Sequence, residues 1–221
     1  TRYGTVTGVQ TCALPISSLL HPLVHQQVNT NDLLSAHFKS RFTGTEFFLR
    51  EHQQVMLGVA YLEMACSAGK FQTGQKIIGL KNVVWSQLLL IAGQAQDVSV
   101  SLHQEGEQYR FQITTQGTDL RENIHCQGKL MIESTSYQEI THNINLQEIQ
   151  SRCNVSITTA ECDRLLQSTH GPSLLTIAQL WHNENEALAL LQLPDFMQSE
   201  SSDYLLHPSM LNGAILSSVV F

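Results

Sequence analysis

The chain has 221 residues, of which 42% are hydrophobic and 14% charged, and its formal net charge at pH 7 is -7. This length allows one or two domains with a sizeable buried core. The negative charge argues against a surface that binds nucleic acid or an anionic membrane. Because no apolar run approaches ~18 residues, no membrane-spanning helix is predicted. The cysteines contain no C-x-x-C pair, which favours reduced thiols in a cytoplasmic protein.

Residues 1–16 are not expected to belong to the native protein. The segment Val6–Ile16 matches the conceptual translation of a common sequencing-library adapter. We therefore leave residues 1–16, with Cys12, out of the fold prediction. The native sequence is expected to begin in the middle of its gene, near Ser17.

The stretch Glu46–Gly69 combines an extended apolar run, a histidine at a turn and a long amphipathic helix. From Gly58 onward apolar residues recur near the helical period without proline, and Gly69 offers a C-terminal stop. His52 precedes this helix. Its imidazole can exchange a proton near neutral pH, and the first N–H groups of the helix can polarise a carbonyl oxygen. The stretch therefore predicts an acid/base site.

Extended segments surround the predicted helix on both sides. Two strands are expected before it, in Leu33–Phe42 and Phe47–Leu49, and four after it, because those segments are rich in β-branched residues and alternate with period two. One long helix among about six strands implies an α+β fold, with an antiparallel sheet wrapped around the helix. The four later strands are predicted at Ile77–Val84, Val98–His103, Tyr109–Thr115 and Ile124–Ile132.

The composition becomes polar over Glu133–Asn154, where only scattered apolar residues remain. This change indicates a linker that carries one short helix at Leu146–Arg152. A second structured region follows. There, Thr158 and Thr159 can cap a helix that continues through Leu166.

The remaining segments predict a second α+β unit that is begun but incomplete. Leu174–Trp181 and Ala187–Leu193 are expected to be strands, Pro194–Asp203 a polar loop, and Met210–Phe221 the start of another core helix. The predicted division is 1–16 as the artefact, 17–134 as the first unit, 135–154 as the linker and 155–221 as the truncated second unit.

The order of motifs from residue 21 to residue 216 resembles that of polyketide synthase dehydratase domains. GVAYLEMA and LHPSMLNGA are specific signals when they occur together. The resemblance implies a double hotdog fold, in which each unit is an antiparallel sheet wrapped around a central helix. It also implies that this chain is truncated at both ends. In chain order the motifs are HPLV, FTGTEFFLREH, GVAYLEMA, LKNVVW, IHCQGKL, HGP and LHPSMLNGA.

The resemblance also implies the roles of two site residues. In this family a histidine removes the α-proton of a β-hydroxyacyl thioester, and an aspartic acid protonates the departing hydroxyl. His52 stands at the histidine, but its motif lacks the internal glycine, has Leu57 at the proline and is shorter by about four residues. Asn212 stands at the aspartate, and Leu216 stands at the glutamine that follows it. An amide cannot supply the proton, so ordinary dehydration is disfavoured.

A single histidine is sufficient to move a double bond between the α,β and β,γ positions of an enoyl thioester. Dehydratase-like enoyl isomerases of trans-acyltransferase polyketide synthases resemble this combination of histidine and asparagine. We therefore predict isomerisation with His52 as the base, Asn212 positioning the substrate and the Gly58 N–H polarising the thioester. His170, Gly171 and Pro172 match a tyrosine-glycine-proline motif that lines the family's substrate channel, with histidine in place of tyrosine.

The resemblance implies that the substrate is carried on the phosphopantetheine of an acyl carrier protein, with no other cofactor. No histidine spacing is typical of a zinc site, so no metal is predicted. The expected partners are that carrier protein and the neighbouring domains of a polyketide synthase, in which the domain forms a homodimer. No nucleic acid and no membrane are expected as partners.

Four alternatives to isomerisation remain open. The first is dehydration of a 3-hydroxyacyl thioester at a reduced rate, and the second is pyran-forming cyclisation, which would give a cyclic product. The third is a catalytically inactive remnant, which the short loop after His52 favours. The fourth is a binding module for carrier-protein docking, which would cross-link to a carrier protein without turnover.

Overall fold

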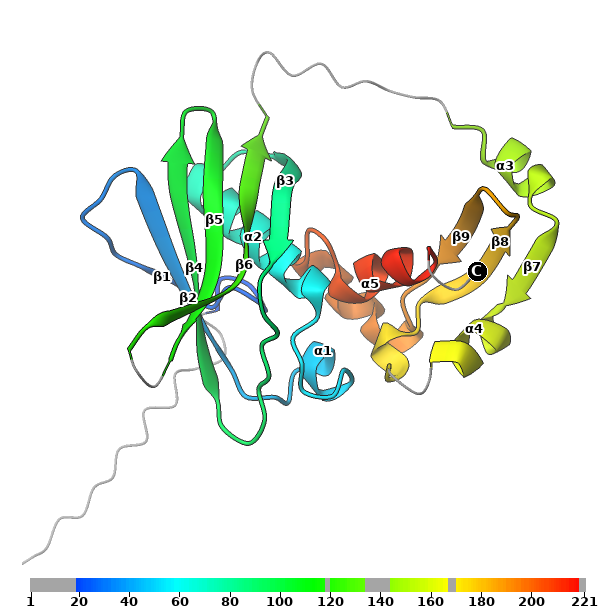
Figure 1. Ribbon diagram of the computed structural model, residues 1–221, viewed down its shortest axis with the longest axis horizontal. Helices are drawn as coiled ribbons and strands as arrows, with labels where there is room; N and C mark the ends of the chain where they lie inside the picture. Colours follow the sequence, from blue (N-terminus) through cyan, green and yellow to red (C-terminus); the bar gives the residue numbers. More distant parts are fainter. Residues whose placement is uncertain (1–18, 118–119, 134–143, 167–169, 219–221) are drawn as a thin grey trace, which may run out of the picture.

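The structure is a computed structural model, and it describes residues 19–117, 120–133, 144–166 and 170–218. Two antiparallel sheets lie side by side in it, one with six strands and one with three (Figure 1). The predicted artefact at 1–16 lies outside the described residues.

The first unit contains the six-stranded sheet, and the four strands predicted after the helix are confirmed. Leu33–Phe42 also contains a strand, and a further short strand precedes it. The strands are β1 (Gln26–Val28), β2 (Ser35–Phe42), β3 (Ile77–Trp85), β4 (Gln96–Glu105), β5 (Gln108–Gln116) and β6 (Glu122–Ile132).

The order of strands in this sheet is β1-β2-β4-β5-β6-β3, and all neighbours are antiparallel. Side chains alternate across the pleat, so that β2 buries Ala36, Phe38 and Phe42 and exposes Lys39 and Arg41. Each fully buried phenylalanine contributes roughly 1.5–3 kcal/mol from apolar burial. This alternation fixes which face of the sheet meets the helix.

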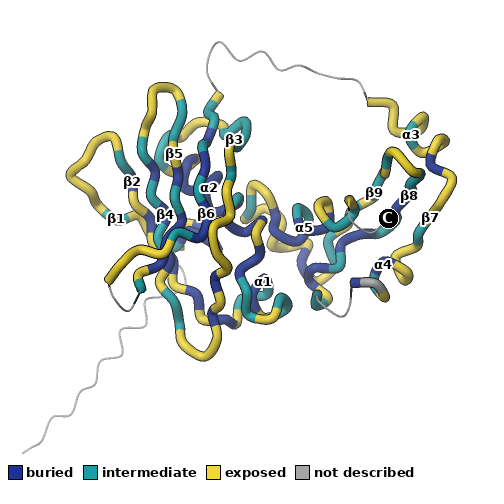
Figure 2. The backbone as a smooth tube through the Cα atoms, viewed as in Figure 1, coloured by how far each residue is buried: buried dark blue, intermediate teal, exposed yellow. Residues whose placement is uncertain are grey.

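Helix α2 (Gly58–Thr73) packs across that face and contacts β3, β4, β5 and β6. Most of its residues are buried, as the dark segments of Figure 2 show. The predicted stop at Gly69 is wrong. The helix ends at Gly74, whose φ of 66° is left-handed and whose N–H donates to the Lys70 carbonyl. Gly69 instead allows close packing, because a Cβ there would lie 2.9 Å from Cδ1 of Leu130.

The strand predicted over Phe47–Leu49 is also wrong, because these residues begin the short helix α1 (Phe47–Arg50). Glu46 folds back over the preceding turn, where its carboxylate accepts hydrogen bonds from the N–H groups of Thr43 and Gly44. The N–H of Arg50 then donates to the Glu46 carbonyl. Three apolar residues are too short a run to separate a strand from a helical turn.

The second unit is built on the smaller sheet, in the order β7-β8-β9. The predicted helices at Leu146–Arg152 and after the Thr158–Thr159 cap are both confirmed. The short first strand of this sheet is not among the predicted elements. The elements are α3 (Leu146–Arg152), β7 (Val155–Thr158), α4 (Thr159–Leu166), β8 (Ile177–His182) and β9 (Ala187–Leu191).

The last described segment runs back between the two sheets. Two 3₁₀ helices, η2 (Pro172–Leu174) and η3 (Asp195–Asp203), flank the pair β8–β9 in sequence. The predicted loop over Pro194–Asp203 is therefore wrong. The predicted core helix is α5 (Pro208–Leu216), which contacts α2, β9 and η2 (Figure 1). Its expected continuation over 219–221 lies outside the described residues, as do residues 134–143 of the linker region.

No helix in the described part of the chain is both long enough and apolar enough to span a membrane.

Candidate active site

The turn that carries His52 closes in spite of its short sequence. Gln53 and Gln54 both have left-handed backbones, with φ of 54° and 63°, and the N–H of Val55 donates to the His52 carbonyl. Nδ1 of His52 lies 2.9 Å from the Val55 carbonyl oxygen. Because a carbonyl can only accept, Nδ1 carries the hydrogen, and in the neutral ring Nε2 holds the lone pair. Nε2 is therefore the nitrogen that can act as a base.

His170 lies next to His52 in the structure. The ring centroids of His52 and His170 are 5.6 Å apart, and the ring planes are tilted by 39°. Burial lowers the pKa of His170, and the charge of His52 lowers it further, against a hydrogen bond to the Leu166 carbonyl that raises it. His170 is therefore neutral near pH 7.

Glu51, which sequence reasoning missed, ties the two histidine segments together. Its carbonyl accepts a hydrogen bond from the N–H of Gly171 at 3.0 Å. Its carboxylate accepts from the N–H of Ser173 at 2.6 Å, from the Ser173 hydroxyl at 2.9 Å and from Arg50 at 2.8 Å. Burial raises the pKa of Glu51, but these hydrogen bonds outweigh it and the net change is downward. Only its position next to His52 could have suggested this role.

Gly171 and Pro172 shape the segment that follows His170. A Cβ at Gly171 would lie 2.6 Å from the Cβ of Glu51, so a larger residue does not fit there. Pro172 is the first residue of η2 and lines a cavity of about 410 Å³ beside β8. Helices α1 and α5 both contact η2. The helix before the His52 turn and the helix that carries Asn212 therefore both pack against η2.

Asn212 lies on α5 and is 8% exposed. Its Nδ2 is buried and has no hydrogen-bond partner in the described structure, as is also true of the Ser209 hydroxyl. His207 caps the start of α5, where its Nδ1 accepts from the Ser209 N–H. A buried amide donor without a partner costs about 1–3 kcal/mol. Among the described residues, Asn212 therefore presents a buried hydrogen-bond donor that is free to bind another group.

Gly58 begins α2, and no side chain in the described part of the chain caps this end of the helix. Its carbonyl accepts a hydrogen bond from Nε1 of Trp85 at 2.9 Å. A cavity of about 370 Å³ adjoins it, lined also by Met56 and Tyr61. The first N–H groups of a helix carry partial positive charge, so a carbonyl group in this cavity would be polarised.

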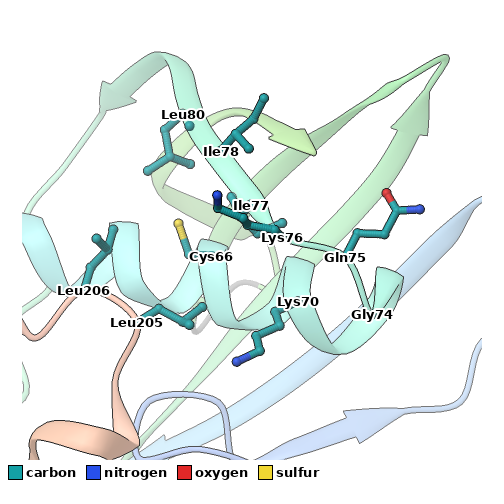
Figure 3. A pocket seen from close by; sticks show the side chains of 11 residues that line it. Cys66, Lys70, Gly74, Gln75, Lys76, Ile77, Ile78, Leu80, Leu205 and Leu206 are labelled. Carbon is teal, nitrogen blue, oxygen red and sulfur yellow. The ribbon is translucent and has the colours of Figure 1, made fainter. Parts of the chain in front are cut away.

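Another cavity lies at the opposite end of α2. It has a volume of about 530 Å³ and is lined by Cys66 and Lys70 of the helix, by β3 and by Leu205 and Leu206 (Figure 3). Burial raises the pKa of the Cys66 thiol to about 12, so it is not a nucleophile. Among the cavities of the described residues, neither this one nor those beside Pro172 and Gly58 is lined by His52, His170 or Asn212.

Glu63 is a second buried carboxylate that sequence reasoning missed. It is fully buried on α2 and accepts hydrogen bonds from the N–H groups of Leu205 at 2.8 Å and Leu206 at 2.6 Å. Nε2 of His21 lies 2.9 Å from its Oε1, and the Ser67 hydroxyl donates to the same oxygen. The only sign of this role in the sequence is that Glu63 lies on the apolar face of the helix GVAYLEMA. Glu63 holds the segment before α5 against the first unit.

Two family models match this chain. The one described as polyketide synthase dehydratase domain matches residues 21–116. The one described as polyketide synthase dehydratase N-terminal domain matches residues 141–218.

Curated relatives come from Bacillus subtilis (strain 168). Polyketide synthase PksN is 35% identical over 218 residues, which is 92% of this chain, and PksM is 32% identical over 222 residues, which is 93%. The chain spans only 4% of the length of PksN and 5% of PksM.

Solved structures match the fold as well. A trans-AT PKS dehydratase domain from Brevibacillus brevis has a TM-score of 0.82 and 30% identity, and the match covers 91% of this chain and 74% of that one. This chain therefore belongs to the polyketide synthase dehydratase family, and its two units are those of the double hotdog fold.

Two further solved structures are similar to this chain. A pyran synthase domain from module nine of the sorangicin pathway has a TM-score of 0.76 and 26% identity, covering 90% of this chain and 72% of that one. An aspartate-to-asparagine variant of the CurK dehydratase, an inactive mutant, has a TM-score of 0.77 and 25% identity, covering 88% and 72%.

Proposed function

We propose that this domain moves a double bond between the α,β and β,γ positions of an enoyl thioester, with His52 as its base. The proposal is supported by the motif LHPSMLNGA, in which Asn212 matches the position of the family's acid. Dehydration needs a proton for the departing hydroxyl, which an amide cannot supply, whereas a double-bond shift has no leaving group. The inactive aspartate-to-asparagine variant of the CurK dehydratase supports the loss of dehydration here.

In the proposed reaction, Nε2 of His52 takes a proton from the γ-carbon and a proton is returned at the α-carbon. The thioester oxygen carries the negative charge of the dienolate in between. The unpartnered Nδ2 of Asn212 would donate a hydrogen bond to the substrate. The Gly58 N–H, at the start of α2, would polarise the thioester carbonyl.

We further propose that the substrate arrives on the phosphopantetheine of an acyl carrier protein and that the domain works beside other domains of a synthase, as a homodimer. The matched relatives are polyketide synthases of which this chain spans a small part, which supports neighbouring domains. Turnover of a carrier-bound thioester should exceed that of the same acyl group on free pantetheine. Equal rates would argue against carrier recognition.

The test is to give the chain an α,β-enoyl carrier-protein thioester in deuterated buffer and to analyse the product by mass spectrometry and NMR. We expect the β,γ isomer, with deuterium entering the acyl chain. Replacing His52 with Gln should lower the rate by roughly 10²- to 10⁴-fold, while the exposed His37→Gln variant should retain it. Absence of both migration and deuterium uptake in the unsubstituted chain would refute the proposal.

A non-catalytic scaffold is the second candidate. The observation that favours it is that His52 does not line the cavities described above. Cross-linking to a carrier protein without any turnover would support this candidate. The similarity to a pyran synthase domain makes cyclisation a third outcome, which a cyclic product from a hydroxylated enoyl thioester would reveal.

A further inference from the structure

We propose that His170 is a second proton carrier that works as a pair with His52. The inference rests on the proposed function, because it concerns the same double-bond shift. In this relay, the proton that His52 removes passes from one ring to the other. In a single-base reaction the proton would stay on His52.

The first support is the orientation of His52. Its Nδ1 is bound to the Val55 carbonyl, which fixes the ring and leaves Nε2 to take the substrate proton. Once Nε2 is protonated, both nitrogens of His52 carry hydrogen, and the ring can only give a proton away. A neighbouring base is needed if that proton is to move on before it is returned.

The second support is the position of His170. The centroids of the two rings are 5.6 Å apart, and ring nitrogens lie at the periphery, so the facing edges are closer than the centroids. A proton can cross such a gap through a single bridging water. Both rings are half-buried, which limits competition from bulk solvent.

The third support is the connection that sets this distance. The Gly171 N–H donates to the Glu51 carbonyl, and these two residues directly adjoin His170 and His52 in sequence. The Glu51 carboxylate adds two bonds to Ser173. One short network therefore holds both histidines across from each other, and Glu51 is a positioning residue for the pair.

The charges of the pair are consistent with a relay. Burial and the charge of His52 lower the pKa of His170. The two rings are therefore not both imidazolium cations at the same time. At rest His170 is neutral. His170 is then able to accept the proton when His52 becomes charged.

The relay balances in three steps. Nε2 of His52 takes the γ-proton, and the C–H electron pair becomes the β,γ double bond. The α,β π electrons then form a double bond from the α-carbon to the carbonyl carbon, and the carbonyl π electrons move onto the thioester oxygen. The His52 imidazolium then passes one proton to neutral His170. Finally the His170 imidazolium protonates the α-carbon, the thioester carbonyl reforms, and both rings are neutral again.

The experiment uses an α,β-enoyl pantetheine thioester that carries deuterium at the γ-carbon, in ordinary water. A relay lets the deuteron exchange with water, so little of it reaches the α-carbon. In His170→Phe the deuteron stays on His52. Its retention at the α-carbon should then rise at least about twofold, and the rate should fall about tenfold.

His170→Asn provides a second variant without a titrating ring, and His37→Phe, exposed on β2, is the matched control that should change neither quantity. Melting curves of each variant establish that it is folded. High deuterium retention in the unsubstituted chain, or retention unchanged by both His170 variants, would overturn the relay.

A measurement without turnover separates this proposal from the proposed function. Replacing His52 with Gln removes the charge that helps to lower the pKa of His170. NMR titration should then show the His170 pKa rising, and His37→Gln should leave it in place. If it does not rise, the rings are not paired, whether or not the chain isomerises. If the chain does not isomerise at all, the proposed function fails and the titration alone decides the pairing.

Discussion

At the scale of single residues, the proposed function depends most on Asn212. It is buried on α5, and its side-chain donor has no partner among the residues that the structure describes. Asn212→Asp places a carboxylic acid where the amide stands, with almost the same shape. Burial raises the pKa of such a group, which keeps it protonated and able to donate.

We expect Asn212→Asp to gain dehydration of a β-hydroxyacyl thioester, by about 10²-fold over the unsubstituted chain. Release of water is followed by the ultraviolet absorbance of the enoyl product. Asn212→Ala is the control, because it removes both the donor and the acid and should gain nothing. A gain in the alanine variant, or none in the aspartate variant, would show that the acid is not what limits dehydration.

Gln53 is the second residue with a testable consequence, because its left-handed backbone costs roughly 1 kcal/mol in a side-chain-bearing residue. Gln53 is exposed, so Gln53→Gly removes the strain without loss of packing. We expect the free energy of unfolding to rise by up to about 1 kcal/mol, measured by urea denaturation. Gln53→Ala keeps the strain and should give no gain, so equal effects of glycine and alanine would contradict the explanation.

At the scale of elements, the contact between α1 and η2 leaves no space for a side chain at Gly171. A Cβ would meet the Cβ, Cγ and Oε2 of Glu51 at 2.6 to 2.7 Å. Gly171→Ala should therefore push the two segments apart and destabilise the fold by about 1–3 kcal/mol. Thermal melting checks the loss. Equal stability of Gly171→Ala and the original chain would contradict the close contact.

The helices and strands also show how much of the fold can be predicted from a single sequence. Helix α2 and strands β4 and β5 follow from residue periodicity, and the start of α4 follows from Thr158 and Thr159. The stop at Gly69 and the strand at Phe47 were wrong, because those positions are set by packing against Leu130 and by the turn of Glu46. Local patterns contain no information on such neighbours.

In the candidate site, too, local sequence patterns identify single residues but not the distant residues that they contact. His52, Asn212 and the segment after residue 170 follow from motifs, and their proposed roles remain predictions. The hydrogen bonds from Ser173 to Glu51 join residues 122 positions apart, and those from Leu205 to Glu63 join residues 142 apart. No pattern within either segment predicts such a pairing.

At the scale of the whole molecule, Glu63 joins the two units. The core of the second unit is small, with Cys162, Leu166, Ile177 and Leu180 as its buried residues, so we expect its stability to depend on this junction. Glu63→Gln removes the negative charge that accepts hydrogen bonds from two backbone N–H groups. The substitution should lower the free energy of unfolding by about 2–4 kcal/mol.

Calorimetry should show Glu63→Gln unfolding in two steps, with the second unit first, while the unsubstituted chain unfolds in one. Glu133→Gln is the control, because its carboxylate is exposed and lies 3.8 Å from Lys76. A single transition at an unchanged temperature in Glu63→Gln would show that the junction does not depend on this carboxylate.

The junction also sets a pH dependence. Burial raises the pKa of Glu63, but the bonds from His21, Leu205 and Leu206 outweigh it, so the folded pKa lies below the ordinary value of 4.5. The stabilisation is therefore fully present above pH 4.5 and is lost as the pH falls through the folded pKa. Glu63→Gln should lose less stability than the original chain over that acid range, in urea titrations at each pH.

The outer strand β3 has a consequence for how copies of this chain meet. It lies at the edge of the six-stranded sheet, where unpaired backbone groups could recruit a strand from another molecule. Its pairing with β6 shifts register twice, Asn82 has a φ of 51°, and Lys81 is exposed beside it. A bulged, charged edge of this kind is a poor template for strand addition, so the fold itself discourages ordered aggregation along this border.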